Sequence, residues 1–191
     1  MEKKFWNKIL KIFRYGVLSV LLSFLIDSQI LSAVIMIQSA LIIQLFSYIT
    51  VLGEILSVIL IGIFLSIFIV KYKMRLLPLW ASLLTVFILL FLVKILIMRP
   101  RPFEILETAS IVSTNLSSFP SGHSMAAFAL LPFVSVMWEK YSYAFWLMAI
   151  LIAFSRIYLQ VHYLSDIVAG AFIGYLISVI YIHLGDKYGW R

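Results

Sequence analysis

The feature that most constrains this chain is a series of long apolar runs. Residues 76–97, for example, carry a single charged side chain, Lys94. About 20 consecutive apolar residues wound as an α-helix cross the hydrocarbon core of a bilayer. Runs of this kind recur along the 191-residue chain, of which 64% is hydrophobic. Because the runs are continuously apolar rather than alternating, they predict membrane helices and not a β-barrel.

The runs predict an all-α integral membrane bundle with six transmembrane helices, forming a single membrane-embedded domain over residues 1–191. The expected spans are 15–26 (extended by apolar residues from Ile9), 49–70, 76–97, 121–138, 143–160 and 163–184. Residues 28–47 are also apolar but are interrupted by Gln and Ser. We expect them to form an interfacial helix that runs into the second span, because a seventh span would scatter the basic residues over both membrane faces.

The basic residues predict the orientation of the bundle. Six spans place both termini on one side, and most of the Lys and Arg residues fall on that same side. These are Lys3, Lys4, Lys8, Lys11, Arg14, Lys71, Lys73, Arg75, Lys140, Lys187 and Arg191. The positive-inside rule makes this side the cytoplasm and predicts a plasma-membrane protein with both termini cytoplasmic. The net charge of +7 then reflects membrane orientation and does not indicate a nucleic-acid partner.

Other chemistry is excluded by composition, and the remaining polar residues are concentrated. The chain has no cysteine, which excludes disulfides, thiolate catalysis and metal sites built on Cys. Ionisable residues at span ends are costly and mark functional sites. They occur in three groups, each at the outer end of a predicted span. In an antiparallel bundle these helix ends meet at one membrane surface. The groups are Lys94 with Arg101-Pro102, Ser121-Gly122-His123, and Ser155-Arg156 with His162 and Asp166.

These side chains predict phosphoryl transfer without a metal or cofactor. His162 and Asp166 are four residues apart and share a helix face, so the carboxylate can fix the imidazole tautomer and leave its other nitrogen as base or nucleophile. His123 supplies a second imidazole in the first turn of a helix, where N–H groups and the dipole favour phosphate. Fixed cations would neutralise the phosphate oxygens. They are Lys94, Arg101 and Arg156.

In combination the three blocks resemble the lipid phosphate phosphatase superfamily, also called the type-two phosphatidic acid phosphatases. That family's first block is Lys, six residues and Arg-Pro, which Lys94 and Arg101-Pro102 match. Its second block, Pro-Ser-Gly-His, is residues 120–123. Its third block is Ser-Arg, five residues, His, three residues and Asp, which residues 155–166 match. All spacings agree over a motif core of about 94–166.

The resemblance implies a role for each motif residue. His162 would be the nucleophile that forms a phosphohistidine, Asp166 would orient it, and His123 would protonate the leaving oxygen. The phosphate would be bound by Lys94, Arg101, Ser121, Gly122 and Arg156. The expected substrate is a polyprenyl diphosphate, phosphatidic acid or phosphatidylglycerol phosphate, hydrolysed at the outer membrane face. Apart from this lipid and the bilayer, no nucleic acid, cofactor, metal or obligate protein partner is expected.

Two alternatives remain open at this point. One is a transferase that passes the phosphoryl group to another membrane lipid, and the other is a non-catalytic lipid-binding or transport protein. Charged residues near the motif are expected to lie outside the chemistry. Arg99 is expected to be solvated or to contact headgroups, Glu104 to be a solvated loop charge, and Asp27 and Glu54 to have no catalytic part.

Overall fold

The computed structural model describes residues 2–71, 76–106 and 117–190. Its elements are α1 (Glu2–Leu25), α2 (Asp27–Met36), α3 (Ala40–Val51), α4 (Ile55–Lys71), α5 (Leu76–Ile97), α6 (Pro102–Ile105), α7 (Gly122–Met137), the 3₁₀ turn η1 (Glu139–Tyr141), α8 (Ser142–Tyr158) and α9 (Leu164–Tyr188). The described part of the chain contains no strand, so the predicted all-α class is confirmed. Three basic residues predicted on the cytoplasmic side lie outside the described residues: Lys73, Arg75 and Arg191.

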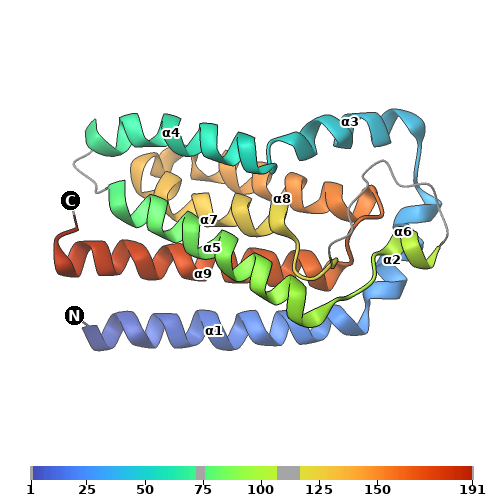
Figure 1. The fold of residues 1–191 in the computed structure, drawn as a ribbon, viewed down its shortest axis with the longest axis horizontal. Coiled ribbons are helices and arrows are strands. Elements are labelled where there is room, and N and C mark those ends of the chain that lie inside the picture. The colour runs from blue at the N-terminus through green and yellow to red at the C-terminus, as the bar shows by residue number, and fades with distance from the viewer. Residues whose placement is uncertain (1, 72–75, 107–116, 191) are drawn as a thin grey trace.

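The long helices form an elongated antiparallel bundle (Figure 1). Both chain termini lie at one end of it, and α2 and α6 lie at the other. The three predicted polar blocks therefore fall at the end opposite the termini. Large apolar side chains such as Leu21, Leu84 and Leu147 are exposed along the helices, as expected for helices whose neighbours are lipid chains.

Helix α7 is the centre of the bundle, because it packs against α4, α5, α8 and α9. Most of its residues are buried, among them Met125, Ala129 and Phe133. Two glycines of α9 allow the closest approach. A Cβ atom at Gly174 would lie 2.0 Å from the Met125 carbonyl oxygen, and one at Gly170 would lie 2.5 Å from that of Ser121. The tight α7–α9 contact fixes the second motif block against the third.

Helix length and composition agree with a membrane bundle. Three helical stretches are long and apolar enough to cross a bilayer: Leu76–Ile105, Glu139–Tyr158 and Leu164–Tyr188. Two bent pairs, α1 with α2 (61°) and α3 with α4 (51°), would bring the number to five if each pair is one span. Helix α7 is apolar but shorter. The count of six spans and the cytoplasmic termini stay predictions.

The prediction for residues 28–47 was wrong in its boundaries. The segment divides into two helices, because the chain breaks after Met36 and Ser39 caps α3 by accepting a hydrogen bond from the Ile42 backbone N–H. Helix α2 lies across the bundle end, but α3 runs along α8. A second break at residues 52–54 falls inside the span predicted at 49–70. Apolar composition could not reveal either break.

Candidate active site

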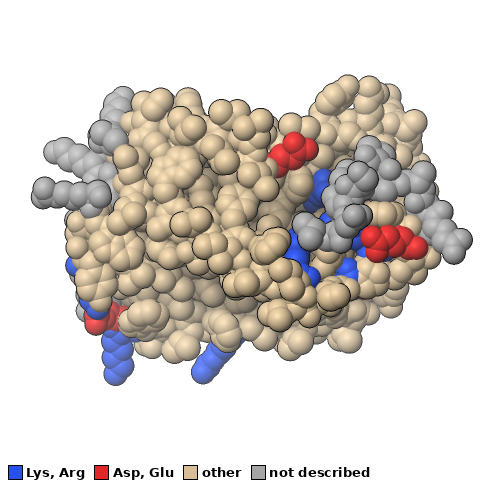
Figure 2. All heavy atoms as spheres, viewed as in Figure 1, with Lys and Arg blue, Asp and Glu red and all other residues tan. Residues whose placement is uncertain are grey.

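All of the predicted site residues come to the bundle end that carries α6. Figure 2 shows a hollow there, with Lys and Arg atoms on its floor and acidic side chains at its rim. The residues come from five different segments: Lys94 from the last turn of α5, Arg101 from the start of α6, Ser121, Gly122 and His123 from the start of α7, Arg156 from the end of α8, and His162 and Asp166 from the start of α9. The antiparallel packing predicted from the apolar runs thus brings the three motif blocks together.

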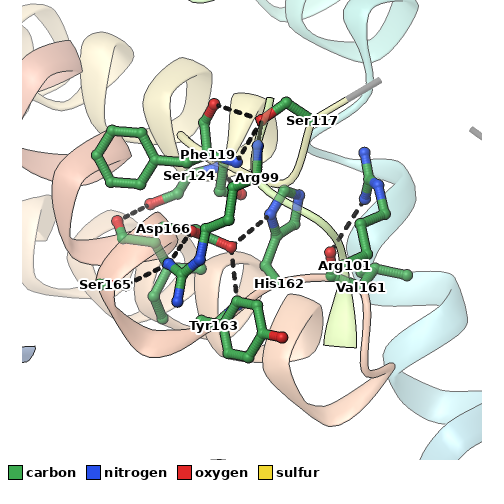
Figure 3. Close-up of polar contacts among 12 residues, drawn as sticks. Arg99, Arg101, Ser117, Phe119, Ser124, Val161, His162, Tyr163, Ser165 and Asp166 are labelled. Atoms are coloured by element: carbon green, nitrogen blue, oxygen red, sulfur yellow. Dashed lines mark hydrogen bonds and ion pairs between the residues drawn. The ribbon is translucent and has the colours of Figure 1, made fainter. Parts of the chain in front are cut away.

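His162 is held by Asp166. The Nδ1 atom of His162 lies 3.3 Å from Oδ2 of Asp166, and both residues are almost completely buried. The same carboxylate oxygen accepts a 2.9 Å hydrogen bond from the Tyr163 backbone N–H. Figure 3 shows the His162 ring between Asp166 on one side and Arg101 on the other. The predicted i, i+4 pair therefore exists, and it fixes the ring through one nitrogen.

Arg99 binds the other carboxylate oxygen of Asp166. Its Nη1 donates a 2.7 Å hydrogen bond to Asp166 Oδ1, and its Nη2 lies 2.8 Å from Asp27 Oδ2. The guanidinium is sandwiched by aromatic rings, with its Cζ 4.0 Å from the centre of the Tyr163 ring. Only 20% of its side chain is exposed. The expectation that Arg99 is a solvated or headgroup-contacting residue was wrong.

Asp27 completes this network from the start of α2. It is 6% exposed and accepts hydrogen bonds from both the backbone N–H (2.8 Å) and the hydroxyl (2.5 Å) of Ser165. A buried carboxylate needs such partners to remain charged. Through Ser165 and Arg99, Asp27 therefore belongs to the ion-pair network around the site. Sequence reasoning did not foresee this structural role, and the expectation that Asp27 has no catalytic part stays a prediction.

On the other side of His162 lie the predicted phosphate ligands. Arg101 is 4% exposed, and its Nη1 donates a 3.0 Å hydrogen bond to the carbonyl of Val161, next to the histidine. The Lys94 ammonium donates to the carbonyl of Ser117. Glu104 is exposed, as expected, and caps the short α6 by accepting from the Arg101 backbone N–H. Each of these two cations thus has a backbone oxygen among its partners.

Two of the buried side-chain atoms without a hydrogen-bond partner within the described ranges are nitrogens of predicted site residues. They are Nε2 of His123 and Nε of Arg156. Arg156 is 3% exposed and its Nη1 donates a 2.6 Å hydrogen bond to Thr50 of α3. Buried polar atoms are rarely left unpaired unless they meet a ligand or serve in the chemistry. His123 and Arg156 are therefore the best candidates for direct contact with a phosphate.

The start of α7 is built for close packing. The Ser121 hydroxyl accepts from the Ser124 backbone N–H at 3.5 Å, and the Ser121 N–H donates to the Asp166 carbonyl at 3.0 Å. A Cβ atom at Gly122 would lie 2.8 Å from Leu90 Cδ2, so this glycine also permits the contact between α7 and α5. Gly53, in the break before α4, lies against the His123 ring.

Electrostatics keep His162 neutral in the free site. Burial lowers the pKa of His162 well below its ordinary value, and the charges of Arg156, Arg101 and Lys94 lower it further. A neutral imidazole has the free electron pair that a nucleophile needs.

Sequence reasoning missed four contributors: Arg99, Asp27, Thr50 and Gly53. A signal existed for the first two, because a charge at a span end needs a partner. Arg99 and Asp27 are such charges on the same predicted side. Nothing in the local sequence marks Thr50 or Gly53. Among the described residues, no cluster of three or more His, Asp or Glu side chains is placed to hold a metal ion.

Comparison with known proteins gives a family match and a relative. The sequence pattern of the PAP2 superfamily matches residues 75–190, which include all three motif blocks. Phosphatidylglycerophosphatase B of Bacillus subtilis (strain 168) is 31% identical over 100 residues, covering 47% of this chain and 47% of that protein. The match thus spans about half the length of this relative.

Two crystal structures share the fold. The first transmembrane PAP2-type phosphatidylglycerolphosphate phosphatase from Bacillus subtilis superposes with a TM-score of 0.77 at 23% identity, covering 94% of this chain and 96% of that one. Aquifex aeolicus LpxE superposes with a TM-score of 0.74 at 27% identity, covering 83% of this chain and 95% of that one. The agreement over most of the chain extends the likeness beyond the motif core to the whole bundle.

Proposed function

The chain belongs to the PAP2 superfamily, and on that basis we propose that it is a membrane lipid phosphatase that works through a phosphohistidine. The observation that carries the proposal is the asymmetric setting of His162. One nitrogen of its ring is held by Asp166, and Arg101 lies on the other side. His123 and Arg156 add buried side-chain nitrogens without partners among the described residues. Such a site suits a phosphate more than any neutral ligand.

The proposed reaction has two steps. The His162 nitrogen that does not face Asp166 attacks phosphorus, and the bond from phosphorus to the leaving oxygen breaks. His123 donates its proton to that oxygen, which leaves as an alcohol or a lipid monophosphate. Water then attacks the phosphohistidine, His123 takes a proton from the water, and inorganic phosphate departs from neutral His162. The cations offset charge on the phosphate oxygens in both steps.

The substrate supplies part of the acid chemistry. Arg156, Arg101 and Lys94 lie at the same bundle end as His123, and their positive charges oppose a positive imidazole. A bound phosphate brings negative charge that offsets these cations. His123 therefore becomes an effective acid when the substrate is present.

Arg99 acts through Asp166 as a positioning residue. It ties the carboxylate that orients His162 to Asp27 at the start of α2. Each acceptor of Asp166 has a donor, so the carboxylate has one orientation in which to hold the ring. A fixed ring at the right angle to phosphorus is worth a large part of the rate in such reactions.

The substrate class is a phosphate or diphosphate on a membrane lipid. The candidates are phosphatidylglycerol phosphate, phosphatidic acid, a polyprenyl diphosphate and a lipid A phosphate. Phosphatidylglycerol phosphate comes first because the relative and the crystal structure from Bacillus subtilis are both named for it. The basic residues gathered around the termini support an active site on the outer face of the plasma membrane.

Phosphate release from purified protein tests the proposal. We expect wild-type protein to release phosphate from at least one of these lipids, with excess chelator present, and vanadate to inhibit it. His162→Ala should release none. A strict need for a divalent metal would contradict the metal-free reaction. Phosphate appearing on an added acceptor lipid instead of in solution would identify a transferase, and no turnover with any lipid would favour a binding protein.

A further inference from the structure

A second charged hollow lies at the opposite end of α9 from His162. This is the bundle end that holds the termini (Figure 1). The volume of the hollow is about 1180 Å³, and it lies between the start of α1 and the end of α9. We call it the lysine hollow. The basic residues that line it are Lys3, Lys4, Lys8, Lys11 and Lys187. Nothing in the proposed phosphatase reaction uses them.

The hollow has a fixed frame. The Phe5 ring stacks on His183 with centres 3.5 Å apart and planes 13° apart. Lys187 pairs with Glu2 at 2.5 Å, which joins the last turn of α9 to the first turn of α1. The Nε2 atom of His183, which lines the hollow, is buried and has no hydrogen-bond partner in the described part of the chain. The hollow thus contains, beside its lysines, one polar side-chain atom that is available to a ligand.

The charges in the hollow are unbalanced. Five lysines line it against two carboxylates, Glu2 and Asp186, and Glu2 is already paired with Lys187. Lys4, Lys8 and Lys11 follow one another at helical spacing on one face of α1, where like charges repel. An anion placed among them would remove this repulsion and gain several charge-assisted hydrogen bonds.

The position of the lysine hollow along α1 indicates that the anion is the headgroup of a membrane lipid. Helix α1 has 24 residues, or about 36 Å at the helical rise, against a hydrocarbon core of about 30 Å. Exposed apolar side chains begin at Trp6 and continue along the helix from Leu10 and Phe13. The lysines of the first turns therefore lie at the level of the lipid headgroups, where Trp and Lys residues gather.

We propose that the lysine hollow binds the phosphate headgroup of an anionic phospholipid from the leaflet on the side of the termini. The lysines bind its phosphate, and its acyl chains lie along the exposed apolar surface of α1. Basic pockets between membrane helices are suited to such headgroups. The bound lipid would join α1 to α9 and so stabilise the packing of α1 against a long helix of the bundle. This site does not depend on the proposed phosphatase activity.

Lipid-dependent unfolding of the full chain tests the proposal. We expect dioleoyl phosphatidylglycerol, added to protein in neutral detergent, to raise Tm and to remain bound to the protein as a single lipid in native mass spectrometry. The same amount of dioleoyl phosphatidylcholine should do neither. Lys4→Gln with Lys8→Gln should weaken the apparent affinity for phosphatidylglycerol by about tenfold or more.

A charge-matched variant provides the control. Arg14→Gln with Lys140→Gln also removes two positive charges from basic residues assigned to the same side, but neither residue lines the hollow. It should keep the wild-type response. Equal losses in the two double variants would show a general surface attraction and overturn the site. An equal rise of Tm with inorganic phosphate alone would overturn the assignment to a lipid.

Discussion

The two sides of His162 differ in how their polar atoms are satisfied. On the Asp166 side, every carboxylate has donors: Arg99 bridges Asp166 and Asp27, and Tyr163 and Ser165 supply the rest. On the opposite side, where Arg101 also lies, Nε of Arg156 and Nε2 of His123 are buried and have no partner among the described residues. We call these the paired side and the donor side.

The difference separates orientation from binding. A network whose members are all satisfied is rigid, because moving any one of them leaves a buried polar group unpaired. Buried donors without protein partners are suited to an anionic ligand. We therefore expect changes on the paired side to affect kcat and changes to the cations of the donor side to affect substrate binding. His123 is the exception on the donor side, because its proposed role as an acid makes it affect kcat. The predictions below test this division, beginning with the residue that both sides share.

His162→Ala should have the largest effect, a loss of kcat on the order of 10⁴ or more, because it removes the nucleophile itself. The measurement is steady-state phosphate release with the preferred lipid, together with a search for acid-labile, alkali-stable phosphoprotein after rapid quenching. Wild type should show the phosphoprotein and the variant should not. Turnover near the wild-type level in His162→Ala would show that the nucleophile is another residue.

His123→Ala should lower kcat by about 10²–10⁴ for a lipid phosphate, since the leaving alkoxide then departs without a proton. The effect should shrink toward tenfold or less for an aryl phosphate, whose leaving group needs no acid. The comparison of the two substrates in one variant is the measurement. Equal losses for both would remove His123 from the acid role and leave it only as a phosphate ligand on the donor side.

The motif residues could be predicted from sequence for a physical reason. Helix length and packing fix where helix ends meet, and helical spacing fixes His162 against Asp166. The paired side could not be predicted in the same way. Asp27 contacts Ser165 across 138 residues, and this contact depends on the 61° bend between α1 and α2. An apolar pattern records which residues enter the membrane, but it does not record where a helix bends.

The same limit explains Thr50 and Gly53. Gly53 lies within the break at residues 52–54 and Thr50 just before it, in a span that the apolar pattern predicts as continuous. The break lets Gly53 lie against His123, and Thr50 accepts a hydrogen bond from Arg156. The structure thus brings the predicted site residues to one bundle end, while Asp27, Thr50 and Gly53 reach them from bends in the first third of the chain.

Arg99→Gln and Arg101→Gln should separate the two sides, although the residues are only two positions apart. Arg99→Gln should lower kcat by about 10- to 100-fold with KM changed by about twofold or less, because Asp166 loses its partner and no longer fixes the ring. Arg101→Gln should chiefly raise KM and weaken inhibition by vanadate. The measurement is the division of each loss between kcat and KM.

Two further variants distinguish a specific effect of Arg99→Gln from simple misfolding. Arg99→Lys keeps a cation but cannot reach both carboxylates as a fork, so it should restore only part of kcat. Asp27→Asn should lower kcat in the same direction as Arg99→Gln, with no change in vanadate inhibition. If Arg99→Gln and Arg101→Gln gave the same division between kcat and KM, the distinction between a paired side and a donor side would be lost.

Gly53→Ala should have the smallest effect and tests how closely the donor side is packed. The added Cβ would lie 2.9 Å from Cδ2 of His123 and 2.7 Å from Cγ2 of Ile152, so the His123 ring must shift. We expect kcat for a lipid phosphate to fall by about three- to tenfold, because small displacements of an acid reduce proton transfer.

Gly62→Ala is the matched control, since its Cβ would meet Trp80 at 3.1 Å, away from the site. Gly62→Ala should lower stability by a similar or smaller amount and leave kcat unchanged. If both variants lost activity in proportion to their loss of folded protein, Gly53 would be a packing residue only. A loss confined to Gly53→Ala, and smaller for an aryl phosphate, would tie the break before α4 to the position of the acid.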